Sequence, residues 1–163
     1  MHTEHHLRDE FYNAITHGLG ALLSIIGGIV LITLAAIYGN QWQLISAVIY
    51  SISLVGLYGA STLYHSTHEP IAKRRYKVLD HCMIYVLIAG SYTPFTLIAM
   101  RDDGGWWLFG ISWSMALAGI VFKLFFTGRF ELLSTLLYLG MGWMMLFAAG
   151  PMLRNIGTAE LAW

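Results

Sequence analysis

The chain has 163 residues, of which 57% are hydrophobic and only 11% are charged, and its mean hydropathy is +0.62. Soluble domains carry about 25% charged residues, so this composition argues against a water-soluble globule. Nine basic and nine acidic residues give a net charge of zero, and such a chain has no bulk attraction for nucleic acid. The single cysteine, Cys82, excludes an intrachain disulfide framework.

Residues 1–17 are polar and are expected to form a cytoplasmic N-terminal segment. They lack the basic start and apolar core of a cleaved signal peptide, and the apolar run that follows is too long for one. Glu10, Asn13 and His17 precede this run. We expect His17 either to join a polar site at this end of the molecule or to cap the first span.

Five apolar runs follow, each long enough to cross a hydrocarbon core of about 30 Å, which takes about 20 helical residues. No linker or repeat divides them, so residues 18–163 are predicted to form one all-α domain, a polytopic transmembrane helix bundle. The spans are expected at about 18–38, 42–64, 78–100, 106–126 and 132–152. Residues 158–163 resemble the start of a sixth helix that stops abruptly at Trp163, so we expect the sequence to be a truncated part of a longer protein.

Basic residues are divided unevenly between the two ends of these runs. Only Arg101 and Arg154 fall at one end, and seven fall at the other: Arg8, Lys73, Arg74, Arg75, Lys77, Lys123 and Arg129. The positive-inside rule places the larger group, and with it the N-terminus, in the cytoplasm. Lys123, near the end of the fourth run, is expected to reach the headgroups along its own stem.

Small residues and one proline predict how the helices pack. Gly20, Ser24 and Gly28 form a stripe of small residues spaced four apart, and Gly56 with Ala60 forms another. Such stripes favour close contact between helices in a membrane. Pro94 is expected to kink the third span.

Three polar residues in the second and third runs are the candidate functional residues. Ser61 and His65 are four apart and therefore share one helix face. His65 ends the second run and Asp80 lies near the start of the third, at a predicted depth of roughly 3–5 Å. Ionisable groups at membrane depth are rare and mark functional sites. Because the second and third runs are expected to be antiparallel neighbours that meet at this boundary, we expect His65 and Asp80 to approach each other across one water.

An imidazole and a carboxylate suit zinc. His65 is the candidate ligand, and Asp80 is a second ligand or the base that holds a zinc-bound water. Ser61 would orient His65 or polarise a substrate carbonyl. Simpler interpretations stay open: His65 as an interfacial residue, Asp80 as a helix cap, and His68 and His81 as residues outside any site.

Three segments resemble the haemolysin-III family, the bacterial arm of the progestin and adipoQ receptor group, within a wider set of membrane hydrolases that includes alkaline ceramidases. They are residues 10–20 (EFYNAITHGLG), 61–66 (STLYHS) and 79–95 (LDHCMIYVLIAGSYTPF). The resemblance implies a seven-helix protein of the bacterial inner membrane, with an intramembrane zinc near the cytoplasmic face. In the family pattern, the histidine that matches His65 binds the metal, and a serine matches Ser61. The aspartate that matches Asp80 holds the metal-bound water.

The same resemblance implies two further zinc ligands from a His-x-x-x-His motif on a seventh helix. No such motif follows Asp80 in this sequence, so five spans are present of an expected seven, and the remaining ligands are expected beyond Trp163. One histidine and one carboxylate are too few for a tight site. We therefore expect this chain to bind zinc weakly or not at all, unless His17 or His81 substitutes.

Three functions remain open at this stage, all with membrane lipid as the expected partner. The first is a zinc-dependent hydrolase of lipid amides or esters, with Asp80 as general base. The second is a non-enzymatic sensor or receptor-like protein of membrane homeostasis with structural zinc. A pore-forming cytolysin, which the family name implies, ranks last because the sequence shows no amphipathic lining or charge ring.

Overall fold

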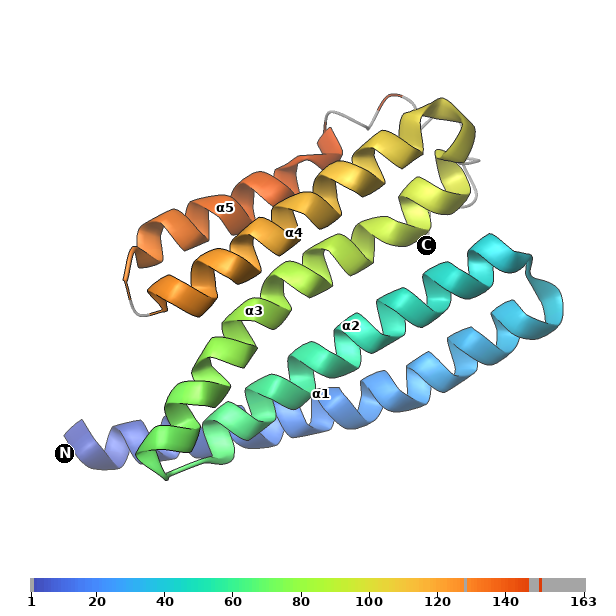
Figure 1. Cartoon of the computed structure of the whole chain (residues 1–163). Helices are drawn as coiled ribbons and strands as arrows, with labels where there is room; N and C mark the ends of the chain where they lie inside the picture. Colours follow the sequence, from blue (N-terminus) through green and yellow to red (C-terminus); the bar gives the residue numbers. More distant parts are fainter. Residues whose placement is uncertain (1, 128, 147–149, 151–163) are drawn as a thin grey trace.

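The computed structural model describes residues 2–127, 129–146 and 150. All regular structure in this part of the chain is helical, which confirms the predicted all-α bundle (Figure 1). The elements are α1 (His2–Tyr38), α2 (Gln41–Ser66), α3 (Pro70–Pro94), η1 (Phe95–Ala99), η2 (Arg101–Gly105), α4 (Trp106–Phe126) and α5 (Glu131–Trp143). The predicted start of a sixth helix at 158–163, including Trp163, lies outside the described residues.

Four helical segments of the described chain are long and apolar enough to cross a membrane: Leu7–Tyr38, Gln41–Ser66, Pro70–Ala99 and Arg101–Phe126. The fifth expected span, 132–152, is described only in part. Two helices begin at least eight residues before the expected spans, α1 at His2 and α3 at Pro70. The polar residues before the first and third apolar runs therefore belong to continuous helices with definite faces.

Side-chain caps explain why the first two connections are so short. The Asn40 side chain accepts hydrogen bonds from the backbone N–H groups of Trp42 (2.9 Å) and Gln43 (3.1 Å), and the Gln43 side chain accepts one from Asn40 N–H (2.8 Å). This is a capping box, which satisfies free donors at both ends of the motif. At the start of α3, Glu69 accepts from the N–H groups of Ile71 and Ala72, with Pro70 in the first turn.

These backbone donors make the Glu69 cap sensitive to pH. The N–H groups of Ile71 and Ala72 stabilise the carboxylate and lower the pKa of Glu69 below its ordinary value of 4.5. Because the folded pKa is the lower one, the stabilisation is present above the unfolded pKa and is lost as pH falls through the folded pKa. We expect Glu69→Gln to lower the unfolding midpoint at pH 7 and to make little difference once Glu69 is protonated. Thermal unfolding of both proteins from pH 7 down to pH 3 checks this, and a pH-independent difference would contradict it.

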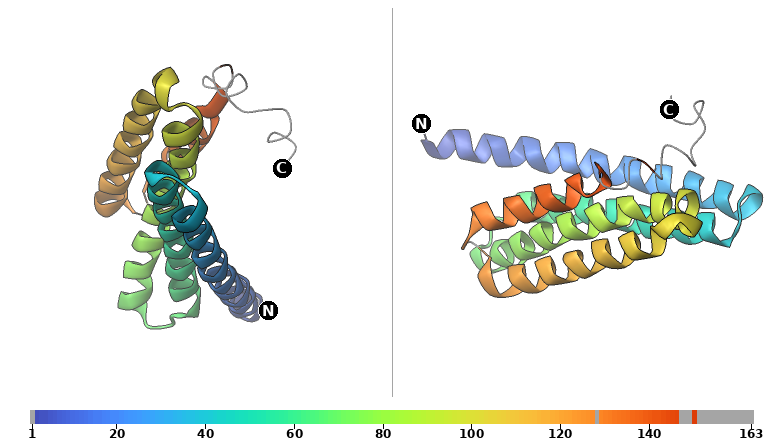
Figure 2. Two further views of the ribbon diagram at one scale, coloured as in Figure 1. Left: turned by 90° about the vertical axis from the view of Figure 1, so that its right-hand side faces the viewer. Right: turned by 90° about the horizontal axis from the view of Figure 1, so that it is seen from above.

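The helices pack in chain order. Helix α1 packs on α2, α2 on α3 and α3 on α4, while α5 contacts α3 and α4 (Figures 1 and 2). A small core lies between α3, α4 and α5, formed by Tyr85, Ala89, Ala116 and Met141. Beside it, the Tyr92 hydroxyl donates to the carbonyls of Met141 (2.7 Å) and Gly142 (2.8 Å), which joins α3 to the end of α5.

Small residues lie where the helices approach most closely, as predicted. A Cβ added at Gly28 would come within 3.0 Å of Ser51 Cβ, and one added at Gly20 would meet the Tyr58 ring at 2.6 Å. Gly56 meets Met83 of α3 in the same way. The stripes on α1 and α2 are therefore helix contacts.

At Pro94 the α-helix α3 passes into η1 with helical backbone angles (φ -60°, ψ -43°), so the expected kink there stays a prediction. The chain continues through η1 and η2 and reverses into α4, with Gly104 at φ 83°. Trp42 and Trp106 pack edge to face at this end of the bundle, with ring centroids 5.4 Å apart. The Arg101 guanidinium lies over the Trp42 ring at 5.2 Å.

Candidate functional site at the basic end

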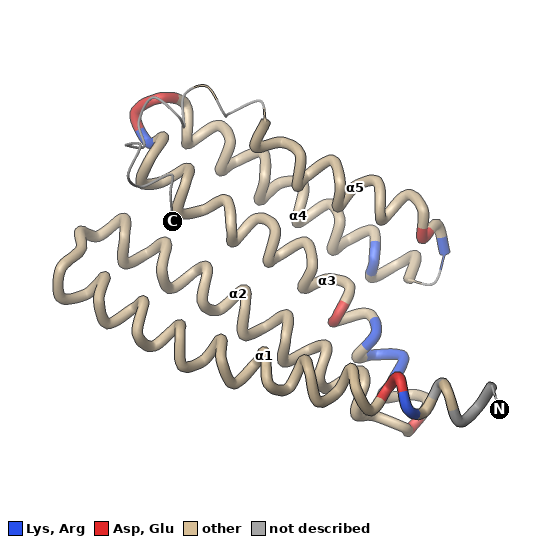
Figure 3. The backbone as a smooth tube through the Cα atoms, turned by 180° about the vertical axis from the view of Figure 1, so that it is seen from behind, with Lys and Arg blue, Asp and Glu red and all other residues tan. Residues whose placement is uncertain are grey.

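Charged residues gather at one end of the bundle, which we call the basic end. It comprises the N-terminal part of α1, the α2–α3 connection and the α4–α5 turn (Figure 3). The positively charged stretch of residues 73–77 begins α3 there. All three candidate residues from the sequence lie in the half of their helix nearest this end.

An ion cluster joins three helices at the basic end. Glu10 of α1 accepts a hydrogen bond from Lys73 Nζ of α3 at 2.6 Å, and the same carboxylate oxygen lies 3.2 Å from His65 Nδ1 of α2. We call Glu10, His65 and Lys73 the three-helix cluster. Glu10 is 9% exposed, so its charge is buried, whereas the side chains of His65 and Lys73 remain partly exposed.

Lys73 also holds the end of α2. Its Nζ donates to the carbonyls of Tyr64 (3.2 Å) and Thr67 (3.3 Å) and lies 4.7 Å from the centre of the Tyr64 ring. A cation favours the free carbonyls at a helix C-terminus. One lysine therefore neutralises Glu10 and closes the last turn of α2.

A second polar level lies deeper in the same three helices. The His17 ring is 5.5 Å from the His65 ring, and its Nδ1 is buried with no hydrogen bond to a described residue. His17 follows Glu10 by seven residues and Asp80 follows Lys73 by seven. Seven residues return to nearly the same helix face after a rise of about 10 Å. His17 and Asp80 are thus placed at similar depth, below Glu10 and Lys73.

The candidate residues stand as follows. Ser61 is 3% exposed and lies one turn before His65 on α2. Asp80 is half-buried, ten residues into α3. Within the described chain it forms no hydrogen bond or salt bridge, and the partner that His65 contacts is Glu10 rather than Asp80.

A cavity of about 520 Å³ opens beside His65. One wall is apolar and comes from α1, with Leu7 and Phe11 among its residues, and the other is formed by His65, Ser66 and His68. A site with a hydrocarbon wall and an imidazole edge suits an amphiphile.

His81 belongs to a different neighbourhood, between α3, α4 and α5. The Tyr138 hydroxyl donates to the His81 carbonyl at 3.1 Å, and the charges of Asp80 and Lys123 lie near the His81 ring. Lys123 is only 2% exposed, so the expectation that its side chain extends to the headgroups is wrong. It is enclosed by protein near Lys77 and Glu131, which are 3.9 Å apart.

The described residues do not form a metal centre by themselves. Nowhere in residues 2–127 and 129–146 are three His, Cys, Asp or Glu side chains grouped to hold an ion. The further ligands that the sequence leads us to expect beyond Trp163 are not part of this chain, so that expectation stays a prediction.

His65 nevertheless has the environment of a ligand. Its Nδ1 is bonded to Glu10, and its Nε2 makes no hydrogen bond to a described residue. A carboxylate bonded to one ring nitrogen orients the other, as in carboxylate–histidine–zinc arrangements.

Sequence reasoning misses Glu10 and Lys73 as members of the site. The charge pattern indicates only that Lys73 helps to set the orientation in the membrane, and the polar composition around Glu10 indicates only a cytoplasmic N-terminal segment. The signal for Glu10 is its spacing of seven from His17, which has meaning only if residues 2–17 are helical.

Comparison with known proteins gives the same family over almost the whole chain. A family model described as haemolysin-III related matches residues 5–163. The Hemolysin-3 homolog of Bacillus subtilis (strain 168) is 48% identical over 153 residues, 94% of this chain and 72% of that protein. Hemolysin-3 of Bacillus cereus is 45% identical over 150 residues, covering 92% and 68%.

More distant similarity reaches animal proteins. The human monocyte to macrophage differentiation factor is 26% identical over 161 residues, covering 92% of this chain and 64% of that protein. No solved structure matches.

Proposed function

The chain belongs to the haemolysin-III-related family, and from that premise we propose that this membrane protein hydrolyses amide or ester bonds of membrane lipids at its basic end. The observation that carries the proposal is the position of Ser61 and His65. They lie one turn apart on α2, and His65 lines a cavity whose other wall is apolar. A lipid in this cavity would present its polar linkage to His65 and its chain to α1.

Asp80 is the proposed general base. An unpaired carboxylate on a membrane-spanning helix is costly and is retained for function. Within the described chain Asp80 has no hydrogen-bond or salt-bridge partner that would occupy it as a structural residue. It would accept the proton of the attacking water, while the Ser61 hydroxyl would donate to the substrate carbonyl.

Zinc is part of the proposal, with His65 as one ligand and Asp80 acting through a bound water. A catalytic zinc takes three protein ligands, so the remaining ligands are proposed to come from a segment beyond Trp163. The Glu10–His65 hydrogen bond supports this assignment because it leaves His65 Nε2 available. When bound, zinc would lower the pKa of its water and polarise the carbonyl.

The proposal places the protein in the bacterial inner membrane with the basic end in the cytoplasm. The clustering of Lys and Arg at this end supports that orientation (Figure 3). Substrate would then enter from the inner leaflet.

A second function is favoured by the three-helix cluster itself. Glu10, His65 and Lys73 tie α1, α2 and α3 together. If zinc only reinforces this tie, the protein is a non-enzymatic membrane sensor with a structural metal.

Replacing Asp80 by Asn separates the two functions. The test uses a protein that carries the ligands proposed beyond Trp163, in proteoliposomes containing an N-acylated sphingoid lipid or a phosphatidylcholine. We expect Asp80→Asn to lower fatty-acid release at least about 100-fold, because general base catalysis contributes about 10²–10⁴. The unfolding midpoint should stay within about 2 °C of the unsubstituted protein, as for a change away from packed contacts.

Asp102→Asn, an exposed acid at the opposite end, is the matched control and should keep full turnover. Metal analysis and His65→Ala complete the test. If no lipid is hydrolysed, and if chelation and His65→Ala lower only thermal stability, the sensor function replaces the hydrolase.

A further inference from the structure

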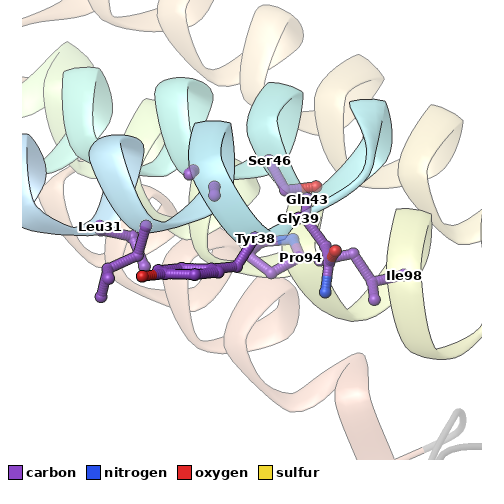
Figure 4. A pocket seen from close by; sticks show the side chains of 10 residues that line it. Leu31, Tyr38, Gly39, Gln43, Ser46, Pro94 and Ile98 are labelled. Carbon is purple, nitrogen blue, oxygen red and sulfur yellow. The ribbon is translucent and has the colours of Figure 1, made fainter.

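A separate cavity lies at the opposite end of the bundle, where α1 turns into α2. It has a volume of about 330 Å³ and is formed by facing sides of α1 and α2, closed by Pro94 and Ile98 (Figure 4). Neither the proposed reaction nor the ion cluster uses it. Among the described residues, no Lys, Arg, Asp or Glu lines it, so it fits an uncharged part of a ligand.

Ser46 is the distinctive residue of this cavity. It is 1% exposed, and its hydroxyl is buried without a hydrogen-bond partner in the described chain. Two other buried serines of these helices are bonded within their own helix: Ser24 donates to the Gly20 carbonyl at 2.6 Å and Ser53 to the Ile49 carbonyl at 2.7 Å. Ser51 is buried without a partner in the described chain as well, but it does not line this cavity. An unsatisfied hydroxyl within the hydrocarbon region is costly. The Ser46 hydroxyl therefore needs a hydrogen-bond acceptor, and a ligand in the cavity could supply one.

The cavity opens sideways rather than to the end of the molecule. Leu31, Leu34 and Ile98 line it and are themselves exposed, on helices that are apolar enough to lie among lipids. From Leu31 on α1 to Gly39 just after it, the wall covers nine residues, a rise of about 12 Å. That length lies within one leaflet of a hydrocarbon core of about 30 Å.

We propose that this cavity binds a membrane lipid from the leaflet at the α1–α2 turn, with one acyl chain along Leu31 and Leu34 and an ester carbonyl accepting the Ser46 hydroxyl. Tyr38, Gly39 and Gln43 line the cavity beside the α1–α2 turn, where a polar headgroup would lie. Apolar burial of the chain supplies the affinity, and the single buried donor selects a carbonyl-bearing lipid.

Photo-crosslinking in vesicles tests whether the bound lipid needs an ester carbonyl. The chain is reconstituted into phosphatidylcholine vesicles doped with a diester phosphatidylcholine that carries a diazirine in its acyl chain, or with the diether analogue, which has no carbonyl. We expect Ser46→Ala to lower diester labelling of the segment 31–47 about fivefold, the effect of one lost hydrogen bond, and to leave diether labelling unchanged. Ser53→Ala, whose hydroxyl is bonded within its helix, is the control.

Cavity filling tests the site independently of the hydroxyl. Ala35 lines the cavity, whereas its neighbour Ala36 is exposed and does not. Ala35→Leu should lower labelling by both lipids, and Ala36→Leu should lower neither. Equal labelling of all four variants would show only bulk lipid around the helix and would overturn the proposal. If lipid labelling falls as the protein-to-lipid ratio in the vesicles is raised, a second copy of the chain occupies the cavity. That result would overturn the proposal as well.

Discussion

The Glu10→Ala variant is expected to lose about 2 kcal/mol of unfolding free energy. Removing one partner of a buried ion pair costs about 3–5 kcal/mol, and partial exposure of the other partner reduces this. The Lys73 side chain is 26% exposed and that of Glu10 is 11% exposed. The loss arises because Lys73 and His65 remain in the bundle without the carboxylate that both of them contact. Equilibrium unfolding in mixed detergent micelles measures it.

Two further variants give the control and the test of cause. Asp9→Ala removes an exposed acid at the preceding position and should change stability by no more than about 0.5 kcal/mol. Adding Lys73→Met to Glu10→Ala should recover part of the loss, because the unpaired charge is removed. If Glu10→Ala and Asp9→Ala unfold alike, the three-helix cluster does not stabilise the bundle.

The same cluster bears on function through His65. Glu10 bonds to one ring nitrogen and leaves the other free, so the contact that stabilises three helices also sets the direction of the proposed ligand. A stabilising role and a metal-orienting role are compatible in one residue. The hydrolase and the sensor differ only in whether Asp80 and Ser61 then act on a lipid.

The architecture could be predicted from the sequence because its signals are local. Apolar runs of about 20 residues with short polar connections demand helices in a membrane, and the small residues at Gly20, Gly28 and Gly56 lie at helix contacts as expected. Residues 2–17 are different. Their polar composition indicates only a cytoplasmic segment before the first span, whereas in the structure they form the first part of α1 and bring Glu10 into contact with α3.

The site could be predicted only in part. Ser61 and His65 follow from spacing on one helix, but Lys73 meets Glu10 across 63 positions of sequence, and no periodicity encodes such a contact. Lys123 shows the same limit. Its place near a helix end predicts a side chain that reaches the headgroups. In the structure Lys123 is instead buried, because α3 and α5 pack around it.

Replacing Gly119 by alanine is expected to destabilise the bundle by about 1–3 kcal/mol, the usual cost of overpacking a tight core. A Cβ at this position on α4 would overlap the ring of Tyr85 on α3. Tyr85 has no exposed surface and packs against Tyr138 of α5 at a ring-centroid distance of 4.4 Å. The ring therefore cannot retreat without moving Tyr138, whose hydroxyl bonds to the His81 carbonyl.

Gly110 offers the matched control, because it lies on the same helix and a Cβ there would meet nothing within 4 Å. Gly110→Ala should leave stability unchanged or raise it by up to about 1 kcal/mol, the helix-propensity gain of alanine over glycine. The two variants add the same methyl group, so their difference in unfolding free energy isolates the contact with Tyr85. Equal stability of the two would mean that α4 does not approach α3 this closely. The core that holds α3, α4 and α5 together would then need a different packing.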